Sequence, residues 1–149
     1  EYGNVIWGPF YEGDSQNVER IQRRATKGVP GISSLSYEER LRRLKLPSLQ
    51  HRRRRGDMIM TYKIVTGKVN LDRKDFFTFA PNQTNRGSHP YKIGKPKAVK
   101  EVRRNTFSTR VVNDWNNLPK DVVLAQTTNE FKSKIDEYWG TKEECATPF

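Results

Sequence analysis

Residues 47–67 constrain the fold of this chain more than any other stretch. Ser48 is suited to cap the start of a helix, Gly67 stands where a glycine ends one, and no proline lies between them. The first half contains four successive arginines at 52–55. The second half is apolar on more than half of a helical circumference, through Met58, Ile59, Met60, Tyr62, Ile64 and Val65. We therefore predict a central helix with a cationic half and a buried half.

Four further helices are indicated by periodicity and by capping residues. The first begins at Asp14 or Ser15 and runs to about residue 27, with an apolar face of Val18, Ile21, Gln22 and Ala25. The second opens with a capping box, Ser36 at the cap and Glu39 three residues later. Its inner side is expected to carry Tyr37, Leu41 and Leu44, and its outer side Arg40, Arg42 and Arg43.

The other two helices lie in the second half of the chain. One begins at Asn105 or Thr106 and ends before Pro119, with Phe107, Val111, Trp115 and Leu118 at helical spacing. Trp115 is interpreted as a core residue because it is in register with these apolar neighbours. The last opens with Thr127 or Thr128, buries Phe131, Ile135 and Trp139, and ends at Gly140. We expect a mainly α fold, a small bundle of four or five helices.

One short β-hairpin is also predicted, between residues 91 and 102. Tyr91-Lys92-Ile93 alternates in polarity, and a pairing partner is available near residues 99–102. The preceding run, residues 81–90, has the composition of a loop.

The charge of the chain bears on its partners. The 28 Lys+Arg and 17 Asp+Glu give a formal net charge of +11, which favours nucleic acid, an anionic membrane or an acidic protein. No apolar run is long enough to span a bilayer, so we expect no membrane. A secretory signal is not recognisable, and Cys145 is the only cysteine, so we expect an intracellular location. Within the cell, the expected location is nuclear.

A search for catalytic patterns is negative. The glycines do not match the spacing of a phosphate-binding loop, and the two histidines are far apart without a second ligand nearby. Two-metal nucleotidyl transfer needs converging carboxylates, and no Asp-Asp pair occurs. We expect neither a metal nor a cofactor, and no enzymatic activity in this segment.

Two basic clusters are the positive signal. Residues 19–55 contain twelve Lys and Arg and only three Glu. Residues 86–110 contain eight Lys and Arg, and Glu101 is the one acidic residue among them. Arginine suits phosphate because its guanidinium donates two parallel hydrogen bonds. Nearby aromatics (Tyr37, Tyr91 and Phe107) could stack on unpaired bases. The alternative is that the charges form merely a solvated surface. We predict phosphate contacts by Arg23, Arg24, Arg43, Arg53, Arg54, Lys97, Arg103 and Arg104.

The run at 52–55 cannot face one strand of phosphates as a whole. Four successive helical residues step by about 100° each and sweep most of the way around the axis. At least one of them must therefore lean toward the packed side of the helix and find a partner or reach back to solvent. Which of Arg52 to Arg55 contacts phosphate stays open at this stage.

A series of motifs resembles, in order, the C-terminal end of jockey-like non-LTR (LINE-type) retrotransposon reverse transcriptases. The matching residues are Glu1-Tyr2-Gly3-Asn4-Val5-Ile6-Trp7, Gln22-Arg23-Arg24-Ala25-Thr26, Leu35-Ser36-Tyr37-Glu38-Glu39-Arg40-Leu41, Leu46-Pro47-Ser48-Leu49, Arg53-Arg54-Arg55-Gly56-Asp57-Met58-Ile59, Arg110-Val111-Val112-Asn113-Asp114-Trp115-Asn116-Asn117-Leu118-Pro119 and Phe131-Lys132-Ser133-Lys134-Ile135-Asp136. The resemblance covers roughly residues 1–139.

The resemblance implies a segment downstream of the polymerase palm. Residues 1–29 would end the helical thumb, 30–67 would form a basic helical pair, 68–140 a C-terminal extension and 141–149 a tail. The polymerase carboxylates and the endonuclease of the family would lie upstream. Some relatives carry a zinc-binding C-terminus, from which this chain departs with one cysteine and two isolated histidines.

The expected function is to bind the backbone of RNA or an RNA–DNA hybrid during target-primed reverse transcription, next to the upstream polymerase domains of the same polypeptide. The alternative is a structural module that docks on the polymerase core without touching nucleic acid. An apolar surface left bare around Tyr2, Val5, Ile6 and Trp7 would favour this docking role. An inactive relic of an element is a third interpretation.

Overall fold

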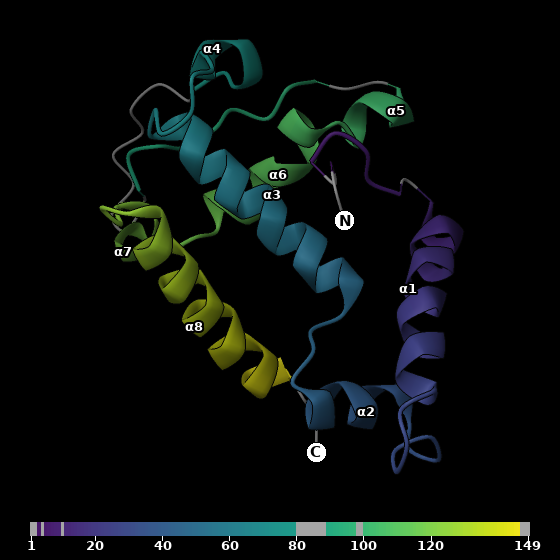
Figure 1. Cartoon of the computed structure of the whole chain (residues 1–149). Coiled ribbons are helices and arrows are strands. Elements are labelled where there is room, and N and C mark those ends of the chain that lie inside the picture. Colours follow the sequence, from purple (N-terminus) through teal and green to yellow (C-terminus); the bar gives the residue numbers. More distant parts are fainter. Residues whose placement is uncertain (1–2, 4, 10, 80–88, 98–99, 147–149) are drawn as a thin grey trace. The chain divides into compact units, whose positions relative to one another are not determined.

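The computed structural model describes residues 3, 5–9, 11–79, 89–97 and 100–146 and is mainly helical (Figure 1). In this part of the chain five helices have eight residues or more, as predicted, and three are single turns. They are α1 (Glu12–Lys27), α2 (Tyr37–Leu44), α3 (Leu49–Val65), α4 (Arg73–Phe76), α5 (Glu101–Arg104), α6 (Phe107–Asn116), α7 (Lys120–Val123) and α8 (Thr128–Ala146).

The chain divides into two compact units, and the division falls inside α3. Unit 1 is Glu1–Asp57 and unit 2 is Met58–Phe149. The sequence placed a boundary after residue 67, at the end of the central helix. The apolar half of α3 supplies Met58, Tyr62, Ile64 and Val65 to the core of unit 2, and the division falls between this half and the cationic half.

In unit 1, α1 and α2 pack through polar side chains. The buried residues of α1 are Glu19 and Thr26, and the buried residue of α2 is Arg40. The predicted apolar face of α1 is wrong, because Ile21 is 69% exposed and Ala25 is exposed as well. The predicted outer position of Arg40 is also wrong: Arg40 is buried, and its guanidinium donates to Thr26 Oγ1 and Arg23 O of α1.

The starts of α2 and α3 and the end of α3 follow the predicted chemistry. The predicted start of the first helix at Asp14 or Ser15 is wrong, because α1 begins at Glu12 after Tyr11, which makes no side-chain cap bond. Ser36 and Glu39 form the capping box of α2, and the Ser48 hydroxyl accepts the His51 amide at 3.1 Å at the start of α3. At the other end of α3, Gly67 has φ of +70°. Its amide donates to Ile64 O and the next amide, of Lys68, donates to Lys63 O. This pair of bonds is the Schellman arrangement that favours glycine.

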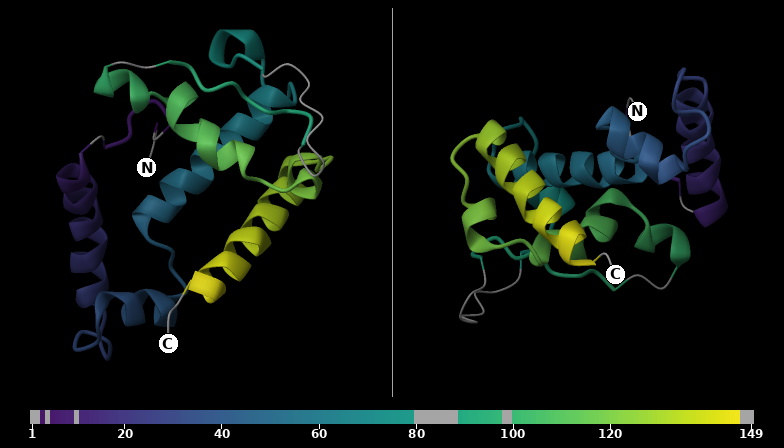
Figure 2. Two further views of the ribbon diagram at one scale, coloured as in Figure 1. Left: turned by 180° about the vertical axis from the view of Figure 1, so that it is seen from behind. Right: turned by 90° about the horizontal axis from the view of Figure 1, so that it is seen from below.

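The core of unit 2 is aromatic. Tyr62 of α3 stacks on Phe131 of α8 with ring centroids 4.3 Å apart, and Trp115 of α6 lies 6.2 Å from Phe131. All three are fully buried, as are Ile135 and Val111. The Tyr62 hydroxyl donates to Ala125 O at 2.5 Å, which satisfies the polar atom of this buried side chain. Figure 2 shows the three helices from behind and from below.

The segment before α5 lies along the C-terminal end of α6. Asn116 pairs with both backbone groups of Ile93, accepting its amide at 3.0 Å and donating to its carbonyl at 2.8 Å. Trp115 Nε1 donates to Tyr91 O at 2.8 Å. Ile93 also forms an isolated antiparallel bridge, and its partner is Phe79. The predicted hairpin partner is wrong at Val102, which lies in α5.

Two other expectations concern the ends of elements. The last helix does not end at Gly140 but continues to Ala146, into the predicted tail. Residue 99 of the predicted hairpin, residues 81–88 of the predicted loop and residues 147–149 lie outside the described residues. None of the described helices is long and apolar enough to cross a membrane.

Candidate nucleic-acid interface

Four cations form a stripe along α1. Arg20, Arg23, Arg24 and Lys27 are all exposed, and at about 100° per residue they occupy roughly 100° of the helical circumference. Among the described residues, the side chains of Arg20, Arg24 and Lys27 have no hydrogen bond or ion pair. We call these four residues the α1 stripe. Its charge faces solvent rather than neighbouring carboxylates.

Arg23 is the fixed member of the α1 stripe. Its guanidinium carbon lies 4.9 Å from the centroid of the Tyr37 ring. Stacking on the ring face holds the guanidinium plane and leaves its N–H edge available, whereas a fully solvated arginine samples many rotamers. Arg23 therefore presents a donor group that has already lost part of its side-chain freedom.

A buried carboxylate positions Tyr37 and joins three helices of unit 1. Glu19 of α1 accepts the Tyr37 hydroxyl of α2, and its two oxygens accept the Leu49 amide at the start of α3 at 3.2 and 3.1 Å. A carboxylate at a helix N-terminus is favoured by the unpaired amides and by the helix dipole. Burial, the Glu19 hydrogen bond and the charge of Glu19 raise the pKa of Tyr37 to about 12.

Arg40 serves the fold of unit 1 and not a ligand. Its Nε donates to Thr26 Oγ1 at 3.2 Å, and its Nη1 donates to Leu35 O. The carbonyl of Leu35 ends the loop between α1 and α2, where a partner from secondary structure is lacking. The planar fork of arginine reaches both helices from one buried position.

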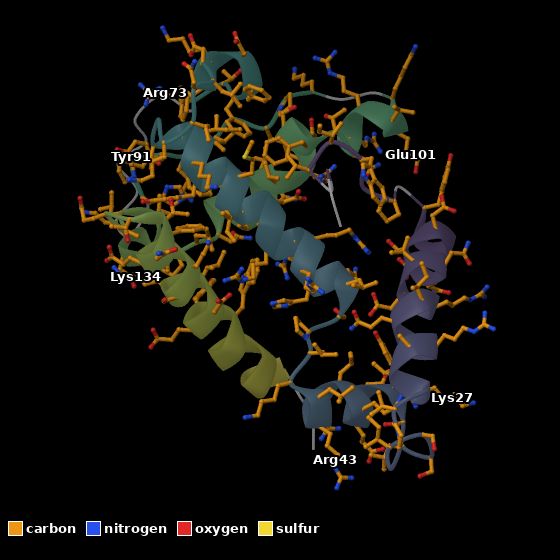
Figure 3. The ribbon with its side chains drawn as sticks, in the orientation of Figure 1. Lys27, Arg43, Arg73, Tyr91, Glu101 and Lys134 are labelled. Atoms are coloured by element: carbon orange, nitrogen blue, oxygen red, sulfur yellow. The ribbon has the colours of Figure 1, made fainter. Side chains whose placement is uncertain are left out.

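The other predicted contacts of unit 1 lie on α2 and α3. Arg43 is exposed on α2, and Figure 3 shows Arg43 and Lys27 at the outer edge of unit 1. In the run at 52–55, Arg52 and Arg54 are exposed and Arg53 and Arg55 are half-buried. This alternation agrees with the prediction that the run sweeps around the helix.

In unit 2 the second basic cluster separates into two groups. Lys92 Nζ donates to Asn116 O at 2.7 Å and Lys95 Nζ to Asn113 Oδ1 at 3.4 Å, so both support the end of α6. Lys97, Arg103 and Arg104 are exposed, and the last two lie on the single turn of α5. The predicted contacts are therefore divided between the units, five in unit 1 and three in unit 2.

The aromatic residues expected to stack on bases are used inside the protein. The Tyr37 ring has Arg23 and Arg40 within 5.8 Å of its centroid. Phe107 lies 6.0 Å from Phe77, with the Arg110 guanidinium 5.9 Å from its ring. Both rings are therefore in contact with other side chains of the protein.

Sequence reasoning left two members of the α1 stripe out of the predicted site. Arg20 and Lys27 complete the spacing 20, 23, 24 and 27, which is the i, i+3, i+4, i+7 pattern of one helix face. The same template that finds an apolar face finds a cationic one when it is applied to Arg and Lys. That signal was present in the sequence.

Comparisons with protein-family models, with curated proteins and with solved structures find no match for this chain. In the described ranges no group of three or more His, Cys, Asp or Glu is placed to hold a metal ion. The description of the interface therefore rests on the geometry of the chain itself.

Proposed function

We propose that this chain binds the sugar–phosphate backbone of RNA or an RNA–DNA hybrid, as a non-catalytic C-terminal segment of a retrotransposon RNA-directed DNA polymerase. The α1 stripe carries the proposal: four exposed cations lie on one helix face, and one of them is held by Tyr37. The proposed role is to hold the nucleic acid by its phosphates during target-primed reverse transcription, without reading its bases.

The charge distribution supports this function at the level of each unit. Unit 1 has 12 Lys+Arg and 7 Asp+Glu, and unit 2 has 16 and 10, so the net charges are +5 and +6. Both units attract a polyanion at long range. Because the aromatic faces are occupied, a duplex with stacked bases suits the surface better than a single strand with splayed bases.

The test is the salt dependence of binding. Fluorescence anisotropy with a labelled RNA–DNA hybrid should give a binding constant whose logarithm falls linearly with the logarithm of the salt concentration, with a slope of about 0.9 per phosphate neutralised. Absent binding, or binding that is insensitive to salt, would refute the proposal.

A specific observation favours docking on protein as a second function. Ile6 is 90% exposed, Trp7 54% and Tyr11 63%, although burial of such side chains is favourable. The proposed partner is the upstream polymerase region of the same polypeptide. Trp115 and Trp139 are buried, so acrylamide quenching of tryptophan fluorescence reports mainly on Trp7. A longer polypeptide that includes the polymerase region should protect Trp7, and unchanged quenching would exclude this docking.

A further inference from the structure

Unit 2 contains a cleft that lies outside the α1 stripe. It has a volume of about 210 Å³, and α4, the strand-like segment at 93–96, α5 and α6 contribute to its walls. Its polar lining includes Lys74, Asp75, Arg103, Ser108 and Thr109. The cleft is smaller than the roughly 300–1,000 Å³ of sites for drug-sized ligands, so it suits a group about as large as a phosphate.

The two cations of the cleft form no ion pair. Among the described residues, neither Lys74 Nζ nor the Arg103 guanidinium has a hydrogen bond or an ion pair, and Asp75, which lines the same cavity, pairs with neither. The two cations come from different elements, α4 and α5, yet line one cavity. Two positive charges and one negative charge leave the lining with a net positive charge, which attracts an anion.

The start of α6 adds neutral donors to the same cavity. Ser108 and Thr109 occupy its first turn, and no side chain caps this helix. The Thr106 hydroxyl donates instead to Arg103 O at 2.9 Å. The Ser108 hydroxyl has no partner among the described residues. Hydroxyl donors beside an arginine and a lysine suit the several acceptor oxygens of a phosphate.

We propose that this cleft binds a single phosphate group of a nucleic-acid strand, held by Lys74, Arg103 and Ser108. This proposal rests on the proposed function for its source of phosphate, but the site itself is defined by unit 2 alone. The α4–α6 cleft fixes one phosphate in a defined place, whereas the α1 stripe neutralises several phosphates along a helix face.

The test is an NMR titration of the ¹⁵N-labelled chain with inorganic phosphate, compared with chloride at the same ionic strength. Saturable shifts should concentrate at the amides of Ser108 and Thr109. The double variant K74A/R103A should lose at least about tenfold in phosphate affinity, because two charge-assisted contacts are removed. The control K120A/K132A removes the same charge from α7 and α8 and should keep the affinity of the parent chain.

The outcomes separate this proposal from the proposed function. If phosphate causes no saturable shift, or if K74A/R103A binds phosphate as tightly as the parent chain, the cleft is not a phosphate site. This conclusion holds even if the chain binds RNA–DNA hybrid. If the phosphate shifts appear while the hybrid does not bind, the cleft stands and the proposed function fails. The Trp115 indole resonance reports that unit 2 of each variant is folded, and K74Q/R103Q serves as a second pair that retains side-chain bulk.

Discussion

At the scale of single residues, Glu19 has the widest structural role in unit 1. One carboxylate joins α1 to α2 through Tyr37 and caps α3 through the Leu49 amide. It is 9% exposed, so no water replaces these partners readily. Removing a hydrogen-bonded buried charge leaves the partner groups unsatisfied, which costs more than the bond itself contributes.

Glu19→Gln should therefore lower the free energy of unfolding of unit 1 by about 1–3 kcal/mol. Urea unfolding followed by circular dichroism measures this change. Glu12→Gln is the matched control, because Glu12 is exposed on the same helix, and it should stay within about 0.5 kcal/mol of the parent chain. Equal effects of the two substitutions would show that the Glu19 contacts do not stabilise the unit.

Tyr37 gives a second test of the same cluster. Its pKa is raised from 10.0 to about 12 by burial and by Glu19, so ionisation of the phenol is disfavoured in the folded state. The contribution of the neutral Tyr37 phenol to the free energy of unfolding is fully present below pH 10 and is lost as the pH rises toward 12. Burial also raises the pKa of Tyr62, so spectrophotometric titration should show late-ionising tyrosines, and Tyr37→Phe should reduce that late component by one tyrosine. If the late component is undiminished in Tyr37→Phe, Tyr37 does not contribute to it.

His89 connects pH to the stability of unit 2. It is 2% exposed, its Nε2 lies 3.1 Å from Trp115 O, and its Nδ1 has no partner among the described residues. Burial, followed by the nearby Lys92 charge, lowers the pKa of His89 from 6.5, against the opposing effect of the Trp115 carbonyl. The neutral form is therefore favoured in the folded state.

The sign of the effect follows from this lowered pKa. The contribution of neutral His89 to the free energy of unfolding is fully present above pH 6.5. It falls as the pH drops through 6.5 toward the pKa of the folded state. Thermal unfolding followed by Trp115 fluorescence should show this loss, and His89→Phe should flatten it while keeping a ring against Trp115. His51→Gln is the control and should leave the loss in place; a loss that survives His89→Phe would contradict the assignment.

At the scale of elements, two glycines have opposite effects on helix stability: one follows the end of α3 and the other lies inside α8. Gly67 ends α3 with φ of +70°, a conformation that costs other residues energy. Gly140 lies inside α8, and a Cβ built there meets no atom within 4 Å. We expect Gly67→Ala to destabilise unit 2 by about 1 kcal/mol and Gly140→Ala to stabilise it by about 0.5–1 kcal/mol. Thermal unfolding distinguishes the two, and a destabilising Gly140→Ala would indicate that the helix ends there.

The elements also show how far the sequence determines the structure. The caps at Ser36 and Ser48, the end of α3 at Gly67 and the buried Trp115 were predictable, because each depends on chemistry within one helical turn. The packed face of α1 was not, because Glu19 is buried by partners 18 and 30 residues away in sequence. The bridge between Phe79 and Ile93 was missed for the same reason, since the sequence between them carries no short hairpin signal.

The candidate site shows the same division between local and long-range information. The cationic face of α1 could be derived from spacing alone. The α4–α6 cleft could not, because it is lined by both Lys74 and Arg103, which are 29 positions apart in sequence. A residue such as Arg40 is indistinguishable from its exposed neighbours until the carbonyl it must satisfy is located.

At the scale of the whole molecule, the two units share the excess charge almost equally. We therefore propose that polyanion binding is divided between the α1 stripe in unit 1 and the exposed cations of the α5 region in unit 2. Because phosphate contacts contribute independently when they are far apart, their salt slopes should add.

The central claim is that the α1 stripe contacts phosphates, and one comparison tests it most directly. The salt slope of RNA–DNA hybrid binding should fall by about 2 in R23A/R24A, since each lost phosphate contact removes about one unit of slope. The slope should remain unchanged in K120A/K132A, which removes the same charge elsewhere. Equal slopes in the two double variants would contradict the claim, because the binding would then report net charge and not a defined helix face.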